Sequence, residues 1–468
     1  MTFVRRASAV LLLVAASAGA GRRAGAQELP KPVAPRVVTL PEAIAYARAH
    51  EPTIRAAQAR VAAEEQAARI PRGQWLPSVG VTAQLFAASA NNTTASFVGG
   101  APYVEIPRIS SGTVTAGGTM RPYASSLAAA GVVQEVFDFG RIAAQSAAAD
   151  ALVEVTRRRL GARVVDVDFG VAESYYAVVA ARGVVRAAEG ALLRARAHRD
   201  LAAAGVTAGM RPPVDLTRAE ADLTRFEVGR VRAEAGLVVA QSGLAAAMGA
   251  PEAAVDAAES RPASPKLQPV EQAVQQAMAK SPRVLEAESR LRAQEQRVTA
   301  IGALLRPNLT ATGSLSLVAG GAPPSGTGEP AHGSGFLPDV PNWDVGLVLT
   351  WPIFNGPIHA QKRAARAGVE VEREELAAVR FGEGAAARRA YVGVQVAEAA
   401  LPALGRAAAA ARANYEQVDA RFKTGLATSV ELSDAEALRS QAEVELTLGA
   451  FDVARARLGL GRLLAEEP

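Results

Sequence analysis

The run Phe422-Lys423-Thr424-Gly425-Leu426-Ala427-Thr428-Ser429-Val430-Glu431-Leu432 decides the fold, because the chain contains its pattern twice. The earlier copy is Val206-Thr207-Ala208-Gly209-Met210-Arg211-Pro212-Pro213-Val214-Asp215-Leu216, which lies 216 residues before it. In each run a glycine ends one predicted helix, and Pro212-Pro213 or Thr428-Ser429 begins the next. The shared Gly-x-x-x-x-Val-Asp/Glu-Leu pattern exceeds what a tight helical turn requires, so we interpret it as part of a duplication.

The duplication extends over most of the chain. Tyr175 matches Tyr391 at the same offset of 216, whereas Trp75-Leu76-Pro77 matches Leu305-Arg306-Pro307 at an offset of 230. The second copy has therefore lost 14 residues between about 78 and 140, which is the difference between the offsets of 230 and 216. Such a unit is too long for a solenoid repeat and indicates two copies of a whole supersecondary assembly. The expected organisation is a signal peptide (1–26), an N-terminal linker (27–41), repeat 1 (42–249), an inter-repeat linker (250–270) and repeat 2 (271–465).

The N-terminus has the pattern of a secretory signal peptide. Arg5-Arg6 precedes a short apolar stretch, and Ala24-Gly25-Ala26 is a small-residue cleavage site, with Ala18-Gly19-Ala20 as a rival; a retained anchor is the alternative. The chain has no cysteine, which excludes a lipid-anchored mature N-terminus, disulfides and thiolate metal sites. Four arginines and no acid lie in 1–26, so the formal net charge of +5 falls to +1 without them and gives no argument for nucleic-acid binding.

Two segments of alternating sequence interrupt a helical pattern. One face of the first is apolar at Val79, Val81 and Leu85, and the second carries Trp343, Val345, Leu347, Leu349, Trp351 and Ile353 against Asn342, Asp344, Gly346 and Thr350. Period-2 alternation predicts strands with one apolar and one polar face, at about 78–138 and 307–354. Beyond the signal, no apolar run reaches the roughly 18 residues of a transmembrane helix.

A soluble sandwich strand shows the same alternation, but the tryptophans favour a membrane strand. Trp343 and Trp351 lie eight residues apart, which is roughly 26 Å along a strand. This length approaches the apolar band of about 25 Å that aromatic girdles flank in outer-membrane barrels. Two hairpins give only four strands, whereas small barrels need about eight, and open edges in hydrocarbon leave backbone groups unpaired. The sequence therefore predicts an oligomer, and a trimer would supply twelve strands.

The remaining sequence predicts helices at 42–72, 141–204 and 213–248 in repeat 1, and at 271–303, 358–421 and 429–464 in repeat 2. Each long segment has 64 residues, or about 95 Å at about 1.5 Å per residue. The two short helices of a repeat, laid end to end, match one long helix. We therefore expect an antiparallel bundle in which alanine-rich faces pack closely.

No catalytic or metal-binding pattern stands out. His50, His198, His332 and His359 are scattered, and none has a partner at helical spacing. We interpret carboxylates such as Asp166 and Asp168, or Glu372, Glu374 and Glu375, as solvated helix faces. The expectation is a protein that is not an enzyme and needs no cofactor or metal.

In their order along the chain, these motifs resemble the TolC-like outer-membrane efflux protein family. The resemblance covers nearly all of the mature chain and rests on the duplication, on the strand entries, and on the turn runs given above. It also rests on Val136-Phe137-Asp138-Phe139-Gly140-Arg141 and Ile353-Phe354-Asn355-Gly356, where strands return to helices. It implies an α+β membrane protein whose duplicated helix–hairpin–long helix–helix repeat forms a homotrimer, with a 12-stranded β-barrel continued by a long periplasmic α-helical barrel.

The resemblance also implies roles for residues at the turns. A tip that docks a periplasmic membrane-fusion adaptor and an inner-membrane pump of RND or ABC type would comprise Gly209, Met210, Arg211, Pro212, Gly425, Leu426, Ala427, Thr428 and Ser429. Glu431 and Asp434 would narrow the entrance, although acids in a helix's first turn also favour the dipole, as at Asp215. Ala427 stands where some relatives use a basic residue to latch the tip, which puts that latching scheme in doubt.

The implied function is an exit duct of a tripartite efflux or type I secretion system, which passively conducts substrates from an inner-membrane pump to the cell exterior. Its place would be the outer membrane, in contact with lipid, extending into the periplasm, and the loops 90–122 and 319–341 would face the exterior. The alternative is a soluble periplasmic coiled-coil adaptor or scaffold, whose strands would be packed by an internal core.

Overall fold

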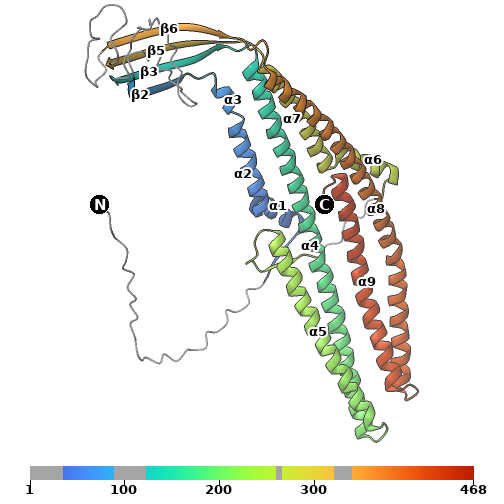
Figure 1. The fold of residues 1–468 in the computed structure, drawn as a ribbon. Helices are drawn as coiled ribbons and strands as arrows, with labels where there is room; N and C mark the ends of the chain where they lie inside the picture. Colours follow the sequence, from blue (N-terminus) through green and yellow to red (C-terminus); the bar gives the residue numbers. More distant parts are fainter. Residues whose placement is uncertain (1–34, 89–122, 260–265, 321–339) are drawn as a thin grey trace, which may run out of the picture.

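The computed structural model describes residues 35–88, 123–259, 266–320 and 340–468. The molecule is elongated, with a sheet at one end and long helices that run away from it (Figure 1). The expected signal peptide and nearly all of the loops 90–122 and 319–341 lie outside the described residues. Within the described ranges, no helix combines the length and apolar character needed to cross a bilayer.

Four antiparallel strands form the sheet, in the order β2 (Ser78–Ala88), β3 (Tyr123–Phe137), β5 (Asn308–Gly320) and β6 (Val340–Thr350). Each repeat contributes one hairpin, and the pairing of β3 with β5 joins the two repeats. One face carries exposed apolar side chains from three of these strands, namely Val79, Val81, Leu85, Leu315, Trp343, Val345, Leu347 and Leu349. On the other face the hydroxyl of Ser314 donates to Asp344. One chain therefore leaves the apolar face uncovered.

The prediction that Trp351 belongs to the last strand is wrong. β6 ends at Thr350, and Trp351 begins a turn in which the amide of Ile353 donates to the Trp351 carbonyl at 2.9 Å. The cause is Pro352, which has no amide hydrogen to continue the ladder. Trp343 does lie on the strand, opposite Leu315, and 78% of its surface is exposed.

Each hairpin returns to a long helix through a capped start. At α4 (Arg141–Thr207, 67 residues) the buried carboxylate of Asp138 accepts from the amides of Gly140 and Ile142. At α8 (Gly356–Lys423, 68 residues) Asn355 accepts from the amide of Ile358 at 3.1 Å. The two long helices then turn back as α5 (Pro213–Ala247) and α9 (Ser429–Leu464).

The helix expected at 42–72 is broken, and so is its counterpart at 271–303. Repeat 1 has α1 (Leu40–His50), α2 (Pro52–Ala67) and α3 (Ile70–Gly73), and repeat 2 has α6 (Val270–Lys280) and α7 (Pro282–Ala303). The breaks fall at Glu51 and Ser281, because a residue before proline is driven out of the helical region. In each repeat, the C-terminal end of the helix that returns from the turn, α5 or α9, lies close to the break. A Cβ on Gly249 would lie only 2.8 Å from the Cα of Glu51, and Gln276 donates to the Leu464 carbonyl at 3.0 Å.

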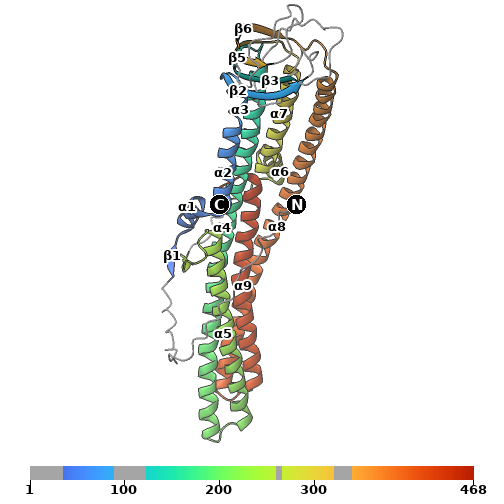
Figure 2. The same cartoon turned by 60° about the vertical axis from the view of Figure 1, so that its left-hand side comes forward.

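A small sheet lies at the level of the break in repeat 1 (Figure 2). Its strands, β1 (Arg36–Val38) and β4 (Val255–Ala257), are parallel. We call β1, β4 and α1 together the collar; the collar packs on α4, α5 and α9. The Tyr175 hydroxyl of α4 donates to the Ala258 carbonyl at 2.8 Å. Asp168, expected on a solvated face, is instead buried and binds Arg48 of α1 through two hydrogen bonds of 3.0 and 2.7 Å.

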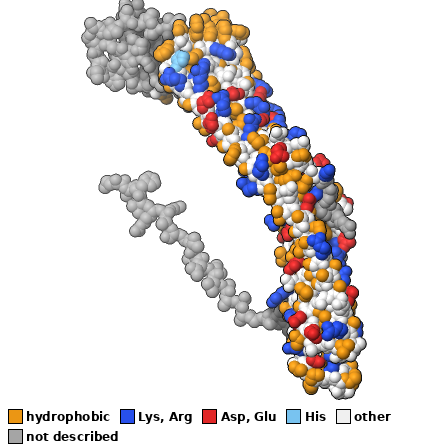
Figure 3. All heavy atoms as spheres, turned by 90° about the vertical axis from the view of Figure 1, so that its right-hand side faces the viewer, with side chains coloured by type: hydrophobic (Ala, Val, Ile, Leu, Met, Phe, Trp, Pro, Cys, Tyr) orange, Lys and Arg blue, Asp and Glu red, His pale blue; other side chains and the backbone are white. Residues whose placement is uncertain are grey.

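Along the helices, Figure 3 shows charged side chains of both signs interspersed with hydrophobic ones. Glu374 and Glu375 of α8 are exposed, in agreement with their interpretation as a solvated face.

Candidate functional site

The first turn joins α4 to α5 at the end of the molecule away from the sheet. Gly209 has φ +68°, a left-handed conformation that closes the turn, and the amide of Met210 donates to the Gly205 carbonyl at 2.9 Å. Pro212 precedes Pro213, the first residue of α5, and no side chain in the described part of the chain caps this start. Met210 is 79% exposed. We call residues 209–212 and 425–429 the tip. Met210 is the large apolar residue that the first turn exposes.

The second turn repeats this geometry with a better cap. Gly425 has φ +79°, and the amide of Leu426 donates to the Arg421 carbonyl at 2.8 Å. Thr428 and Glu431 form a capping box at the start of α9, while Ser429 is the first helical residue. Leu426, which matches Met210, is 71% exposed, whereas Ala427 is buried against Tyr415, Phe422 and Leu432.

The structure links the two turns to each other within one chain. The guanidinium of Arg211 lies 3.7 Å from the ring centroid of Phe422 and donates to the Phe422 carbonyl. On the other side, the hydroxyl of Ser429 donates to the Asp215 carboxylate at 2.7 Å, and Arg211 lies 3.5 Å from that carboxylate. The resemblance indicated that Ala427 stands where some relatives have a basic residue that latches the tip. Arg211, on the other turn, makes the cationic link.

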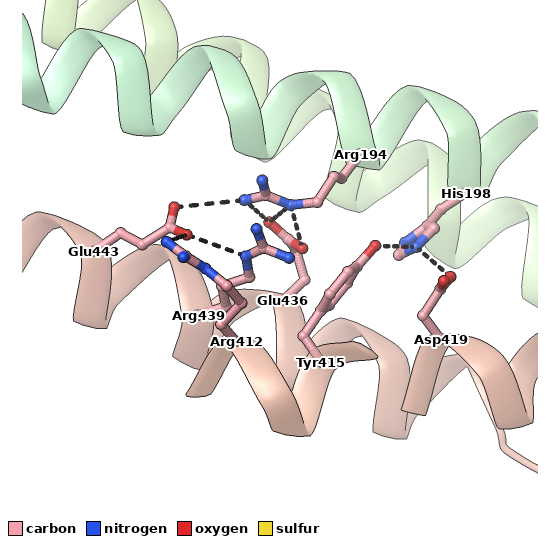
Figure 4. A network of polar contacts seen from close by, with 8 residues as sticks. All are labelled: Arg194, His198, Arg412, Tyr415, Asp419, Glu436, Arg439 and Glu443. Carbon is pink, nitrogen blue, oxygen red and sulfur yellow. Dashed lines mark hydrogen bonds and ion pairs between the residues drawn. The ribbon is translucent and has the colours of Figure 1, made fainter. Parts of the chain in front are cut away.

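Further along the helices, ionic side chains join α4 to α8 and α9 (Figure 4). Arg194 of α4 holds the carboxylate of Glu436 through three N–H···O hydrogen bonds of 2.8 to 3.0 Å, and Glu436 is 1% exposed. Burial raises the pKa of Glu436, and Arg194 opposes this rise. Glu443 of α9 then pairs with Arg439 at 3.1 Å and with Arg412 of α8 at 3.3 Å. The network therefore ties α4 of repeat 1 to α8 and α9 of repeat 2.

His198 extends the network toward the tip. Its ring nitrogen lies 2.9 Å from the hydroxyl of Tyr415 and 3.6 Å from the carboxylate of Asp419, both on α8. Burial lowers the pKa of His198, and the Asp419 carboxylate acts against this effect. Sequence reasoning missed this network, since its members lie up to 249 residues apart (Arg194 and Glu443).

Glu431 and Asp434 follow the second turn, and both side chains are exposed. The Glu431 carboxylate accepts from the Thr428 amide at 2.7 Å, and this bond lowers the pKa of Glu431. Glu431 therefore acts as a capping acid in a single chain, and a role at an entrance stays a prediction. Among the described residues, no group of three or more metal-ligating side chains converges.

Paired helix turns at one end, a duplicated wall of helices, and an uncovered apolar sheet at the other end define the class of outer-membrane channel proteins. The family model described as outer membrane efflux protein matches residues 43–250 and 273–466. The chain belongs to this family, whose members are channel proteins rather than enzymes. It is an exit duct of the outer membrane that serves an efflux system and extends into the periplasm.

Solved structures share the fold at low identity. The outer-membrane channel OprN is 21% identical, with a TM-score of 0.69 over 92% of this chain and 91% of that one. VceC of Vibrio cholerae is 17% identical, with a TM-score of 0.67 over 91% and 96%. MtrE of Neisseria gonorrhoeae, described in its open state, is 20% identical, with a TM-score of 0.65 over 92% and 89%. No curated protein matches the sequence.

Proposed function

We propose that three copies of the chain close one twelve-stranded barrel in the outer membrane and continue it as a helical tube through the periplasm. The observation that carries this proposal is the sheet. Its outer strands, β2 and β6, each pair on one side only within the part of the chain described, and its apolar face is uncovered. Backbone groups left unpaired in hydrocarbon cost several kcal/mol each, so pairing of β6 with β2 of the next copy satisfies both edges.

Sedimentation of the detergent-solubilised full-length protein tests the proposal. We expect a single species with the mass of three chains. A monodisperse monomer that still behaves as an outer-membrane protein would contradict the closed barrel.

The tip would dock a periplasmic adaptor and, through it, an inner-membrane pump of RND or ABC type. In support, Met210 and Leu426 are exposed apolar side chains at matching positions of the two turns, and Arg211 and Ser429 hold these turns together. Replacing Met210 and Leu426 with Asp should reduce copurification of the adaptor and pump from native membranes. Val37→Asp, at an exposed apolar site in the collar, is the matched control.

Glu431 and Asp434 would form acidic rings at the entrance of the trimer. They lie three residues apart on one helix and are both exposed, so three copies would bring six carboxylates around the axis. Rings of this kind favour cations and create a site for divalent block.

The same proposal assigns 1–26 to a signal peptide that is removed and 27–41 to an N-terminal linker. Repeat 1 (42–249) is then joined to repeat 2 (271–465) by the linker 250–270. In support, the same order of elements recurs: short helices, hairpin, long helix, turn and returning helix. A soluble adaptor or scaffold does not account for an apolar sheet face against which none of the described residues forms a core.

A further inference from the structure

The four strands of the sheet meet the helices at one end, through segments that we call the junction. These segments are residues 69–77, 138–147, 301–307 and 351–366. The junction exposes large apolar side chains, among them Leu76, Phe139, Ile353 and Phe354. Ile353 and Phe354 are 78% and 80% exposed and follow the exposed apolar residues of β6 in the chain. The apolar surface of the sheet therefore continues into the junction.

The junction is also strongly basic. Its formal charge is +6, whereas the whole chain carries +5, so all other residues together carry −1. Figure 3 shows Lys and Arg side chains at the end of the helices that adjoins the sheet. The one acid of the junction, Asp138, is buried and caps α4. The seven basic residues are Arg69, Arg72, Arg141, Arg306, Lys362, Arg363 and Arg366.

Few of these charges are neutralised by neighbouring acids. Arg72 lies 2.7 Å from Asp150, and Arg141 lies 3.3 Å from Glu135, and both acids lie outside the junction. With these two acids included, the charge is still +4. The other five basic residues form no ion pair with any described residue, and all but the partly buried Lys362 are exposed; these five are Arg69, Arg306, Lys362, Arg363 and Arg366.

The structure places the basic side chains close to the apolar ones. Arg306 donates to the backbone carbonyls of Phe139 at 3.2 Å and Gly140 at 3.0 Å, which fixes its guanidinium beside this part of the apolar surface. Lys362 and Arg363 lie about 9–11 Å along α8 from its first residue. Side chains of a helix tilt toward its N-terminus, and for α8 that direction is toward the sheet. Long basic side chains at this depth can reach a lipid head-group layer, which is about 5–8 Å thick on each side of a bilayer.

This combination of side chains fits an anionic lipid surface. Aromatic side chains are favoured at the boundary between acyl chains and head groups. Each Lys or Arg near an anionic leaflet strengthens binding roughly fivefold. An apolar band bordered by unpaired cations therefore matches both parts of a phospholipid, its chains and its phosphate.

We propose that the junction binds the head groups of anionic phospholipids in the leaflet of the outer membrane that faces the periplasm. Its exposed apolar side chains contact the acyl chains, and its unpaired basic side chains contact the phosphates. The inference rests on the proposed placement of the sheet in the membrane. It adds a lipid preference that a closed barrel by itself does not require.

Tryptophan quenching in vesicles tests this preference. Of the three tryptophans in the chain, Trp75 and Trp351 lie in the junction, so Trp343→Phe leaves these two as reporters. The full-length variant is reconstituted with brominated phosphatidylglycerol, which is anionic, or with brominated phosphatidylcholine, which has no net charge, each mixed with the unbrominated form of the other lipid. We expect phosphatidylglycerol to bind beside the tryptophans roughly fivefold more tightly, the effect of about one basic residue. The preference should fall as salt is added.

A triple variant in the same background tests the basic residues. Lys362→Gln, Arg363→Gln and Arg366→Gln together should lower the preference for phosphatidylglycerol roughly threefold or more. The matched control removes three exposed arginines of α5 and α8 away from the junction and should leave the preference unchanged; its changes are Arg232→Gln, Arg389→Gln and Arg406→Gln.

The outcomes separate this proposal from the proposed function. Equal quenching by the two lipids, or a preference that the triple variant leaves unchanged, would overturn the lipid site while the barrel stands. No quenching by either lipid would overturn both, because the junction would then not touch the membrane. If the triple variant does not sediment as the wild-type protein does, the single change Arg363→Gln decides, and it should lower the preference roughly twofold.

Discussion

Replacing Arg194 with Leu removes the main partner of a buried carboxylate. The side chain of Glu436 is 2% exposed, and Arg194 of the other repeat donates three hydrogen bonds to its carboxylate. Removing one partner of a buried ion pair costs about 3–5 kcal/mol. Arg439, whose charge also lowers the pKa of Glu436, stays in place. We therefore expect the lower end of this range, about 3 kcal/mol.

Hydrogen–deuterium exchange of the detergent-solubilised protein measures this effect locally. Amides of α4 and α9 on either side of the pair should exchange roughly a hundredfold faster, since each 1.4 kcal/mol is about tenfold. The double variant Arg194→Leu with Glu436→Leu should recover most of the loss, because it leaves no buried charge unpaired.

Arg157→Leu is the matched control. Arg157 also pairs across helices, with Glu65, but the two side chains are 55% and 41% exposed, so solvent screens the pair and its loss should change exchange little. If Arg194→Leu speeds exchange no more than Arg157→Leu does, the buried pair does not hold the repeats together and the reasoning fails.

Three further changes have defined outcomes. The pKa of His198 lies below its ordinary value of 6.5 in the folded protein, so the unfolded chain binds the proton more readily and stability is lost as pH falls below 6.5. Amide protection at the α4–α8 contact, corrected for the intrinsic pH dependence of exchange, should therefore fall between pH 7 and 5, and less so in His198→Gln. Thr428→Ala removes the capping box and should destabilise the first turn of α9 by about 1 kcal/mol, seen as faster exchange there and not in α5, whose start has no side-chain cap. Replacing Glu431 with Gln and Asp434 with Asn should abolish cation preference and weaken divalent block in planar bilayers. Unchanged conductance, selectivity and block would show that these acids only cap the helix.

The features that the sequence predicted are those that depend on local periodicity and on the duplication. Alternation located the strands, and glycines located both turns, because each is a property of neighbouring residues. The breaks at Pro52 and Pro282 were missed, although a proline disfavours helix at the residue before it. The helical pattern is present on both sides of each proline. Periodicity alone therefore predicted one helix where the structure has α1 and α2, and one where it has α6 and α7.

Contacts between the repeats were not predictable, because they depend on the register of helices far apart in the chain. Asp168 and Glu436 look like solvated acids in sequence, yet Arg48 and Arg194 bind them in the interior. Likewise, the contact between Arg211 and Phe422 could not be predicted, because the sequence of one turn does not indicate which side chain of the other turn lies beside it. The strands of the collar have three residues each, too few to show alternation.

The helix breaks have a mechanical consequence. At the level of Glu51 and Ser281, the short helices of both repeats stop, while α4 and α8 pass through without interruption. At that level the wall consists of the two continuous helices and the collar, which packs on α4, α5 and α9. Among the described helices, α4 and α8 alone join the half of the wall that ends in the tip to the half that carries the sheet without a break at this level.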